Sequence, residues 1–225
     1  MNDPGGAGSA GEPAFVVPGP VPDTAALWLI RHGETEWSRS GRHTSRTDLP
    51  LTARGEEQAA ALRELLAGLR PALVLCSPRR RAVHTAELAG LAVDAIDDDL
   101  TEWDYGEYEG LTTAEIRERV PGWSLWTHPV PGGESPAQVS ARADRVLRRT
   151  LPYLDDGPVV LIAHGHISRV IGARWIGLSA VDGQRLALGT AAPSVLGGEH
   201  GTPVVQRWNM PNPDTHRESG GPLAV

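Results

Sequence analysis

Two apolar runs, each ending in a histidine and a glycine, constrain the fold of this chain more than any other feature. Residues 27–30 lead into Arg31 and His32, and residues 159–163 lead into His164. Unbroken apolar runs of this length are typical of strands buried on both faces, as in a parallel sheet between helices. Ligands of open α/β sheets bind just beyond the carboxyl ends of strands. The pattern therefore predicts that both histidines lie at the functional edge of one sheet.

The rest of the chain alternates predicted helices with predicted strands. Hydrophobic periodicity, capping residues and turn residues indicate a mostly parallel central sheet with helices on both faces, an α/β fold of three layers. We expect strands at 26–31, 72–76, 92–96 and 159–163, a closing hairpin at 192–198 and 203–208, and helices at 52–68, 79–90, 112–120, 135–154 and 168–177. The polar segment 33–50 and the segment 97–110 are expected to be loops that line a site.

A chain of 225 residues can bury one sizeable core. We expect a Gly/Pro/Ala-rich disordered leader at 1–25, one domain at 26–210, and a flexible tail at 211–225. No basic segment followed by an apolar one opens the chain, and no stretch is long enough to span a bilayer, so we expect a cytoplasmic protein without a membrane partner.

Composition excludes several classes of site. The formal charge of −7 argues against a nucleic-acid partner, which requires a basic face. All 21 cationic residues are arginines, so a Walker-type phosphate loop and a Schiff-base lysine are excluded. A single cysteine, Cys76, rules out an internal disulfide and a cysteine-cluster metal site, and its apolar surroundings predict a core position.

Several short motifs resemble the histidine phosphatase superfamily, the phosphoglycerate-mutase-like proteins, over residues 26–208. They stand in the order of that family: Leu-Ile-Arg-His-Gly-Glu-Thr at 29–35, Asp-Leu-Pro-Leu-Thr-Ala-Arg-Gly at 48–55, Ser-Pro-Arg-Arg-Arg-Ala at 77–82, Leu-Thr-Glu at 100–102, and Ala-His-Gly at 163–165. Five ordered segments carry more weight than an isolated Arg-His-Gly. The resemblance implies a phosphoglycerate-mutase-like fold and phosphoryl chemistry, and its loops look most like the acid-phosphatase-type branch.

The chemistry of phosphoryl transfer fits the residues that the resemblance selects. Neutral imidazole is a nucleophile near neutral pH, and the resemblance assigns the phosphohistidine to His32. Arginine forks match phosphate oxygens, which suits Arg31 and, from the family pattern, Arg81. His164 is implied as the second histidine on the phosphate. Glu102 is implied as general acid and then base, and we expect Trp103 and Tyr105 to raise its pKa by desolvation.

Other site residues follow from the alignment of loops. Many relatives carry Asn six residues after the nucleophile where this chain has Ser38, so Ser38 is a candidate phosphate ligand with shorter reach. Arg42, His43 and Thr44 align with the substrate-facing loop, and Gly165 adjoins the second histidine. Arg79 and Arg80 are interpreted as rim charges, His166 as a supporting or structural residue, Glu109 as structural, and Gly33 as room for the phosphate.

The preferred hypothesis is a metal-independent phosphatase of small phosphomonoesters, of histidine acid phosphatase type, with no cofactor, no metal and a possible homodimer. A cofactor-dependent phosphoglycerate-type mutase is an alternative, although only residues 111–133 stand where mutases carry a longer insertion. A non-catalytic phospholigand-binding protein is another. The run at 97–101 also fits the Asp-x-Asp-x-Thr pattern of magnesium-dependent aspartyl phosphatases, but three consecutive aspartates make that match easy by chance.

Overall fold

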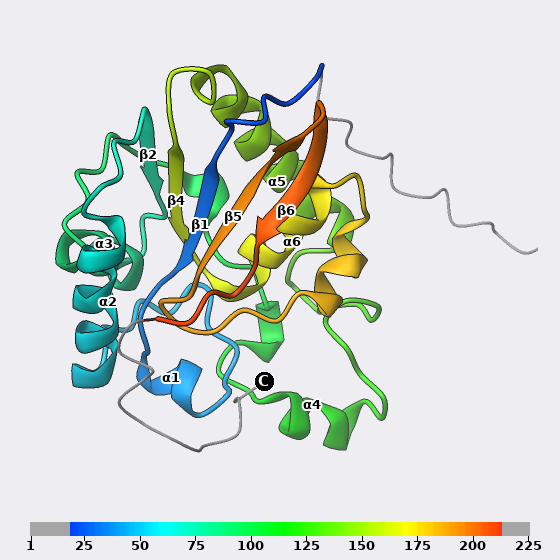
Figure 1. The fold of residues 1–225 in the computed structure, drawn as a ribbon. Helices are drawn as coiled ribbons and strands as arrows, with labels where there is room; N and C mark the ends of the chain where they lie inside the picture. The colour runs from blue at the N-terminus through cyan, green and yellow to red at the C-terminus, as the bar shows by residue number, and fades with distance from the viewer. Residues whose placement is uncertain (1–18, 213–225) are drawn as a thin grey trace, which may run out of the picture.

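A six-stranded sheet forms the centre of the molecule (Figure 1). The computed structural model describes residues 19–212, and the strand order is β3-β2-β4-β1-β5-β6. The four strands from β3 to β1 run parallel, whereas β5 and β6 are antiparallel to their neighbours. The strands are β1 (Leu27–Arg31), β2 (Leu73–Cys76), β3 (Ala95–Ile96), β4 (Val159–Ala163), β5 (Pro193–Glu199) and β6 (Thr202–Arg207).

The register of β1 against β4 brings the two histidines together. These strands pair in parallel from Leu27 with Val159 to Arg31 with Ala163. The next residue of each strand is a histidine, and the backbone N–H of His32 donates to the carbonyl of Ala163 at 3.0 Å. Both histidines therefore leave the sheet at its carboxyl edge, as the sequence predicts.

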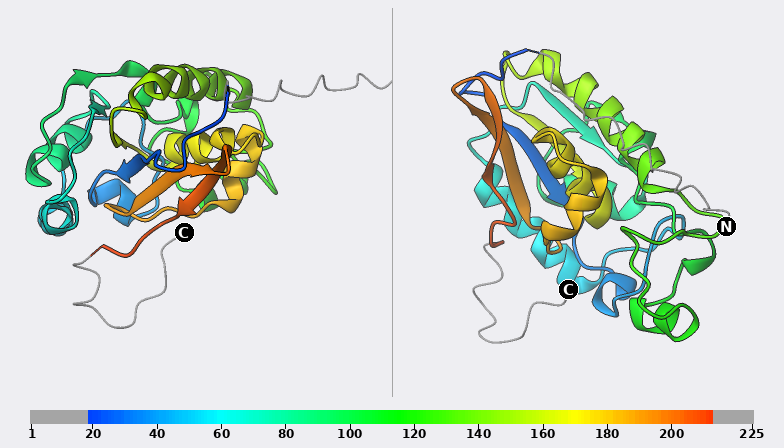
Figure 2. Two further views of the ribbon diagram at one scale, coloured as in Figure 1. Left: turned by 45° about the horizontal axis from the view of Figure 1, so that its top comes forward. Right: turned by 90° about the vertical axis from the view of Figure 1, so that its right-hand side faces the viewer.

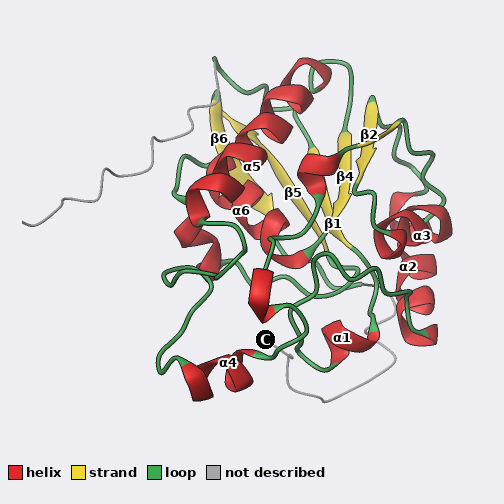
Figure 3. Cartoon of the chain, turned by 180° about the vertical axis from the view of Figure 1, so that it is seen from behind, coloured by secondary structure: helices red, strands yellow, loops and turns green. Residues whose placement is uncertain are grey.

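Alternating side chains of the strands fill two separate cores, one on each face of the sheet. Ile30, Val160 and Ile162 pack with residues of α2 (Ala53–Leu66) and α3 (Arg80–Leu88). Leu29 and Leu161 pack instead with residues of α5 (Pro136–Thr150) and α6 (Gly165–Trp175). Figures 2 and 3 show these helices in two layers, with the sheet between them. The expected three-layer α/β fold is confirmed.

Helix starts follow the capping residues in the sequence. Thr52, Thr112 and Ser135 each accept a hydrogen bond from the backbone N–H three residues on, which satisfies a donor that the helix itself leaves free. The short helices α1 (Glu36–Arg39) and α4 (Thr113–Arg119) both lie beyond the carboxyl ends of the central strands (Figures 1 and 3). Single turns of 3-10 helix occupy Asp98–Leu100, Gly106–Tyr108 and Leu151–Tyr153, and a longer one Ala180–Arg185.

Four features show the main differences from the sequence prediction. The strand expected at 92–96 spans only Ala95–Ile96. The last helix begins at Gly165 rather than near Ser168, because His164 already occupies its N-cap position. The polar segment 33–50 contains α1, whose four residues are too few for a periodic signal. The expected leader reaches residue 25, but Val21 and Ala25 are buried, and the Val21 N–H donates to the carbonyl of Gly201. Residues 1–18 of that leader and 213–225 of the tail lie outside the described residues.

Candidate active site

His32 presents a neutral imidazole with one free ring nitrogen. Its side chain is 5 % exposed, and its Nδ1 lies 2.7 Å from the carbonyl oxygen of Gly33. Because a carbonyl only accepts hydrogen bonds, Nδ1 carries the proton and Nε2 keeps its lone pair. Burial lowers the pKa of His32 well below its usual range, and the charges of Arg81 and Arg31 lower it further. The free Nε2 can therefore attack an electrophilic phosphorus near neutral pH.

His164 packs edge-on against His32, with ring centroids 5.2 Å apart. Its Nδ1 accepts a hydrogen bond from Nε of Arg81 at 3.2 Å, so its Nε2 carries the proton and donates to Oγ of Ser77 at 2.7 Å. Burial lowers the pKa of His164 well below the usual range, and Arg81 and His32 add to that effect. His164 is thus a neutral ring with both nitrogens engaged, and its contact with phosphate stays a prediction.

The two arginines differ in how much of the guanidinium remains free. Arg81 is fully buried, and besides His164 it donates to the carbonyls of Thr44, Ser45 and Thr47. Arg31 donates through Nη1 to the carbonyl of Leu188 at 2.6 Å, but its buried Nε has no partner within the described residues. A buried donor without an acceptor is costly, so the Nε of Arg31 indicates a place for a bound anion.

Glu102 is held in place by the amino end of α6. Its Oε1 accepts hydrogen bonds from the N–H groups of Trp103 and Ile167 at 2.8 and 2.9 Å, and its Oε2 accepts one from the N–H of His166 at 2.9 Å. Free N–H groups and the positive end of the helix dipole both favour a carboxylate there. The side chain is 6 % exposed and is shielded by its neighbours.

The expected rise in the pKa of Glu102 is wrong for the ligand-free protein. Burial beside Trp103 and Tyr105 does raise the pKa. Interaction with His166 and the influence of His164 lower it by more, so that the pKa of Glu102 lies well below its usual range. Donors that stabilise the carboxylate outweigh desolvation. The ligand-free site therefore holds an ionised Glu102.

Gly165 faces the space between the cationic and acidic groups. A Cβ built on Gly165 would lie 3.4 Å from Nε and Cζ of Arg31 and 3.6 Å from Oε2 of Glu102. Gly33 has a different role from the one expected. A Cβ on Gly33 would lie 2.3 Å from the carbonyl oxygen of Gly55, so the absent side chain allows the backbone of α2 to come close. The interpretation of Gly33 as room for phosphate is corrected by this geometry.

The remaining predicted ligands surround the site but are engaged with the protein. The Ser38 hydroxyl accepts from the N–H of Thr35 and donates to its carbonyl, which caps α1. Arg42 donates to the carbonyl of Gly110 and pairs with Glu115. The hydroxyl of Thr44 donates to the carbonyl of Arg42. The structure brings these residues to the same end of the sheet, and their contact with substrate stays a prediction.

His43 lies over the aromatic residues beside Glu102. Its ring centroid is 4.6 Å from that of Tyr105 and 5.6 Å from that of Trp123. Burial lowers the pKa of His43 to about 3, and the neighbouring His166 contributes to this shift. An uncharged imidazole among aromatic rings suits the organic part of a substrate better than its phosphate.

Sequence reasoning underestimated several supporting residues. Ser77 orients His164, and Thr85 accepts from the N–H of Gly33 while donating to the carbonyl of Arg81. His166 bonds the Tyr105 hydroxyl through Nδ1 at 2.7 Å. Ser77 opens the motif at 77–82, and Thr85 belongs to the same family pattern, but the motif alone assigns a role to neither residue. Only the spatial position of α6 identifies His166 as a donor to Glu102.

The structure also describes the surroundings of Arg79 and of the acidic run. Arg79 is half-buried, and its buried Nε has no partner within the described residues. Its interpretation as a rim charge stays a prediction. Asp97 and Asp99 form ion pairs with Arg149, and Asp99 also pairs with Arg145. Burial raises the pKa of Asp99, but hydrogen bonds from both arginines lower it by more. These ion pairs give the carboxylates a structural use.

The magnesium-dependent alternative gains no support from the side chains. Among residues 19–212 no group of three or more His, Cys, Asp or Glu side chains could hold a metal ion. Cys76 is fully buried, and burial raises the pKa of its thiol to about 12, so it remains protonated in the core. No helix in the same range is long and apolar enough to cross a bilayer.

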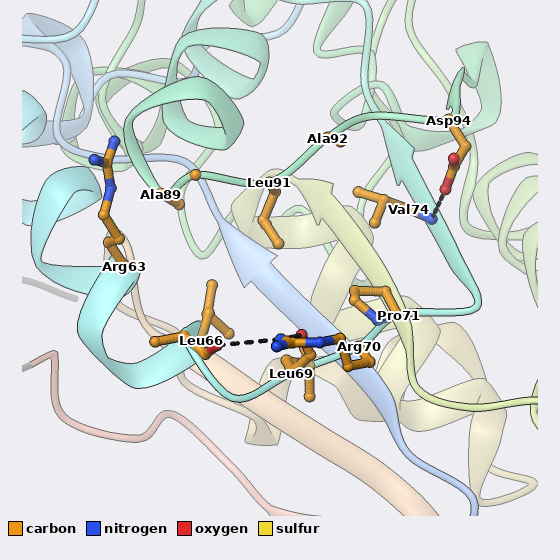
Figure 4. Close-up of a pocket in the computed structure, with 12 residues that line it drawn as sticks. Arg63, Leu66, Leu69, Arg70, Pro71, Val74, Ala89, Leu91, Ala92 and Asp94 are labelled. Carbon is orange, nitrogen blue, oxygen red and sulfur yellow. Dashed lines mark hydrogen bonds between the residues drawn. The ribbon is translucent and has the colours of Figure 1, made fainter.

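Two surface pockets lie near different ends of the sheet. The larger, of about 300 Å³, is lined by apolar side chains such as Leu66 and Leu91 together with Arg63 and Arg70 (Figure 4). There Arg70 donates to the carbonyls of Ala67 and Leu69, and the Val74 N–H donates to Asp94. The smaller, of about 200 Å³, is lined by Glu102, Arg79, Arg46 and their neighbours. The larger pocket contains none of the predicted site residues.

Residues 27–211 match the family described as the histidine phosphatase superfamily (branch 1). An acid phosphatase of Mycobacterium tuberculosis (strain ATCC 25618 / H37Rv) is 48% identical over 177 residues, which cover 78% of this chain and 87% of that protein. A sedoheptulose 1,7-bisphosphatase of Saccharomyces cerevisiae (strain ATCC 204508 / S288c) is 35% identical over 67% of each chain.

Solved structures agree with these similarities. The product of an open reading frame of Mycobacterium tuberculosis superimposes with a TM-score of 0.81 at 45% identity, covering 84% of this chain and 98% of that one. A mycobacterial glucosyl-3-phosphoglycerate phosphatase in complex with VO3 superimposes with a TM-score of 0.74 at 31% identity, covering 83% of this chain and all of that one (100%).

Proposed function

The chain belongs to branch 1 of the histidine phosphatase superfamily, and from that premise we propose that it is a metal-independent phosphatase acting through phosphorylated His32. Its relatives include an acid phosphatase and several sugar-phosphate phosphatases, which support a phosphatase as the coarse function. The observation that carries the finer proposal is the neutral Nε2 of His32 beside the free Nε of Arg31. The charge of Arg31 acts on the pKa of His32, so a free imidazole nitrogen and a buried donor without a partner in the described residues lie near each other.

In the first step Nε2 of His32 attacks phosphorus while the bond from phosphorus to the ester oxygen breaks. Arg31, Arg81 and His164 surround the transferring group, and the two arginines stabilise its charge. Because Glu102 is ionised at rest, the proton enters on the substrate phosphate, whose second pKa is about 6. Glu102 accepts this proton and delivers it to the departing oxygen, so that the product leaves as an alcohol.

In the second step Glu102, again a carboxylate, takes a proton from water. The water oxygen attacks phosphorus as the Nε2–phosphorus bond breaks, which restores neutral His32. The released phosphate leaves with the proton that Glu102 took from water, so Glu102 returns to its carboxylate form. The N–H groups at the start of α6 hold Glu102 in one position through both steps. No step in this sequence needs a metal ion.

The experiment that tests this proposal is hydrolysis of p-nitrophenyl phosphate at mildly acidic pH in excess EDTA. Wild type should retain activity, whereas His32→Ala should lose it by a factor of about 10³ or more. Rapid quenching should trap phosphate on His32 in wild type. Loss of wild-type activity in EDTA, recovered by added magnesium, would contradict the proposal. Full activity of His32→Ala would also contradict it.

The relatives include a probable phosphoglycerate mutase at 28% identity over 191 residues, so phosphoryl transfer to a second sugar hydroxyl remains the alternative. A mutase would return phosphate to an organic acceptor, whereas a phosphatase releases it. Measuring inorganic phosphate against isomerised substrate separates the two. A small phosphorylated substrate, a cytoplasmic location and a possible homodimer stay predictions from the sequence.

A further inference from the structure

Arg169 is an arginine on the face of α6 that looks toward the proposed active site. It follows Gly165 by four residues and His166 by three, so the three lie on one side of the helix. Its guanidinium carbon lies 4.7 Å from the ring centroid of Trp126. Its Nε and Nη2 donate to the carbonyls of Gly183 and Gln184 at 3.0 and 2.9 Å. Stacking and two hydrogen bonds therefore fix this side chain in one orientation.

The charge of Arg169 has no acidic partner in the described part of the chain. No carboxylate oxygen between residues 19 and 212 forms an ion pair with it, and carbonyl acceptors do not neutralise a cation. Its Nη1 forms no hydrogen bond with those residues. Burial lowers the pKa of Arg169, the charge of Glu102 raises it and that of Arg31 lowers it. Both proposed site residues are thus close enough for their charges to act on Arg169.

The side chains between Arg169 and Glu102 form an aromatic wall, defined as Tyr105, Trp126 and His166. The His166 ring lies 5.4 Å from the Trp126 ring and 5.8 Å from that of Tyr105, measured between centroids. Trp126 also packs edge-on against Trp103. If Glu102 protonates the ester oxygen, the alcohol part of the substrate lies next to this aromatic wall. Arg169 contacts the wall at Trp126, and Glu102 contacts it at His166.

We propose that Arg169, held against Trp126, binds a second acidic group on the alcohol part of the substrate. That group is a carboxylate or a second phosphate, both of which match the forked donors of arginine. This inference rests on the proposed function and adds the class of substrate. Phosphomonoesters whose alcohol part carries an acidic group are preferred over those whose alcohol part is uncharged. An arginine fixed before binding loses little conformational entropy when the anion arrives.

The test compares Arg169→Gln with wild type on matched substrates. One pair is 3-phosphoglycerate and glycerol 3-phosphate, which differ by a carboxylate. The other is glucose 1,6-bisphosphate and glucose 6-phosphate, which differ by a phosphate. Removing a charge-assisted contact should lower kcat/KM about 10- to 100-fold for the acidic member of at least one pair. For the members without the second acidic group, kcat/KM should change by less than about twofold. The pair that is affected shows whether Arg169 binds a carboxylate or a phosphate.

The matched control is Arg185→Gln, which removes the same charge from the neighbouring 3-10 helix. Its side chain is 75% exposed and points to Asp182 at 3.8 Å, so kcat/KM should remain at the wild-type value for all four compounds. Equal losses on acidic and neutral members in Arg169→Gln would overturn the inference, since they would indicate an effect on the fold or on the transferring phosphate. Unchanged kinetics would overturn it as well.

A binding measurement keeps this inference separate from the proposed function. In a His32→Ala background, calorimetry should show weaker binding of the preferred acidic compound when Arg169→Gln is added. Binding of its neutral partner should not change. This difference is expected even if wild type turns over none of the four compounds, a result that would contradict the proposed function alone. Equal affinities with and without Arg169→Gln would overturn the inference.

Discussion

At the scale of single residues, Glu102 connects local structure to the proposed chemistry. Three backbone N–H groups and the helix dipole of α6 stabilise its charged form, although burial alone would favour the neutral form. The carboxylate is ready to activate water but has to receive a proton before it can act as an acid. This arrangement ties the acid step to the protonation of the substrate.

Glu102→Gln tests this role through the leaving group. The amide keeps the shape of the side chain but cannot shuttle a proton, so kcat should fall about 10²- to 10⁴-fold on an alkyl phosphate such as glycerol 3-phosphate. On p-nitrophenyl phosphate, whose leaving group needs little protonation, the loss in the phosphorylation step should be much smaller. Single-turnover rates on both substrates measure this step alone. Equal losses on the two would remove Glu102 from the proton-donor role.

The sequence predicts which residues form the candidate site, but it does not predict their tautomers or the direction of their pKa shifts. His32 and His164 follow two buried strands, so the strand pattern predicts that they lie at the same edge of the sheet. Their closeness follows from the pairing of β1 with β4. The tautomer of His32 depends on the carbonyl of Gly33, and the low pKa of Glu102 depends on N–H groups 64 and 65 residues away. Such long-range contacts leave no periodic pattern. The sequence therefore indicates no specific partner for His166.

At the scale of elements, two glycines hold the loop after β1 against the start of α2. A Cβ on Gly55 would lie 2.1 Å from the carbonyl oxygen of Glu34, and a Cβ on Gly33 would meet the Gly55 backbone. Neither contact can be relieved by turning a side chain. The loop that follows His32 is thus positioned by backbone packing, whereas periodicity in the sequence identified only the helix.

Gly55→Ala should destabilise this junction. Inserting a methyl group into packed backbone costs about 1–3 kcal/mol, and the accompanying shift of the loop should also lower kcat. Gly68→Ala is the control, because no atom lies within 4 Å of its Cβ position, and it should be neutral or up to about 1 kcal/mol stabilising. Urea unfolding of both variants measures the difference. Equal stability of the two variants would contradict a packing role for Gly55.

The start of α6 is the element that sequence rules misplaced. Its first three residues, Gly165, His166 and Ile167, carry neither a side-chain cap nor a periodic apolar face, so the predicted helix began near Ser168. The N-cap is His164, whose side chain makes no capping bond because both ring nitrogens serve the site. The free N–H groups of this turn bind Glu102 instead. The first turn of α6 therefore donates to a residue of the site and lacks the capping side chain from which a helix start is predicted.

At the scale of the whole molecule, the buried histidines couple stability to pH. The pKa values of His32, His164 and His166 are all lowered chiefly by burial, and that of His43 is lowered to about 3. In the unfolded chain a histidine titrates near 6.5. Between that pH and the lower folded values, the unfolded state binds more protons than the folded state. Stability is therefore fully present above pH 6.5 and is lost as the pH falls.

We expect the free energy of unfolding to fall between pH 7.5 and pH 5. Each histidine that stays neutral when folded contributes a slope of up to about 1.4 kcal/mol per pH unit below 6.5. The pKa of Glu102 is also depressed, but its contribution is lost only below the ordinary glutamate value, so the slope above pH 5 belongs to the histidines. Urea unfolding followed by tryptophan fluorescence at several pH values measures this slope.

His43→Gln separates one histidine from the other three. Glutamine has a similar reach and does not titrate. Between pH 6.5 and 5 the free energy of unfolding of the variant should therefore depend less steeply on pH, by the share of up to one proton, and the other three histidines should account for the remaining slope. Its stability at pH 7.5 gives the cost of the substitution itself, which the pH series then subtracts. A wild-type stability that is constant from pH 7.5 to 5 would contradict neutral buried histidines. It would equally remove the basis for a neutral, nucleophilic His32, because the same burial keeps all four rings uncharged.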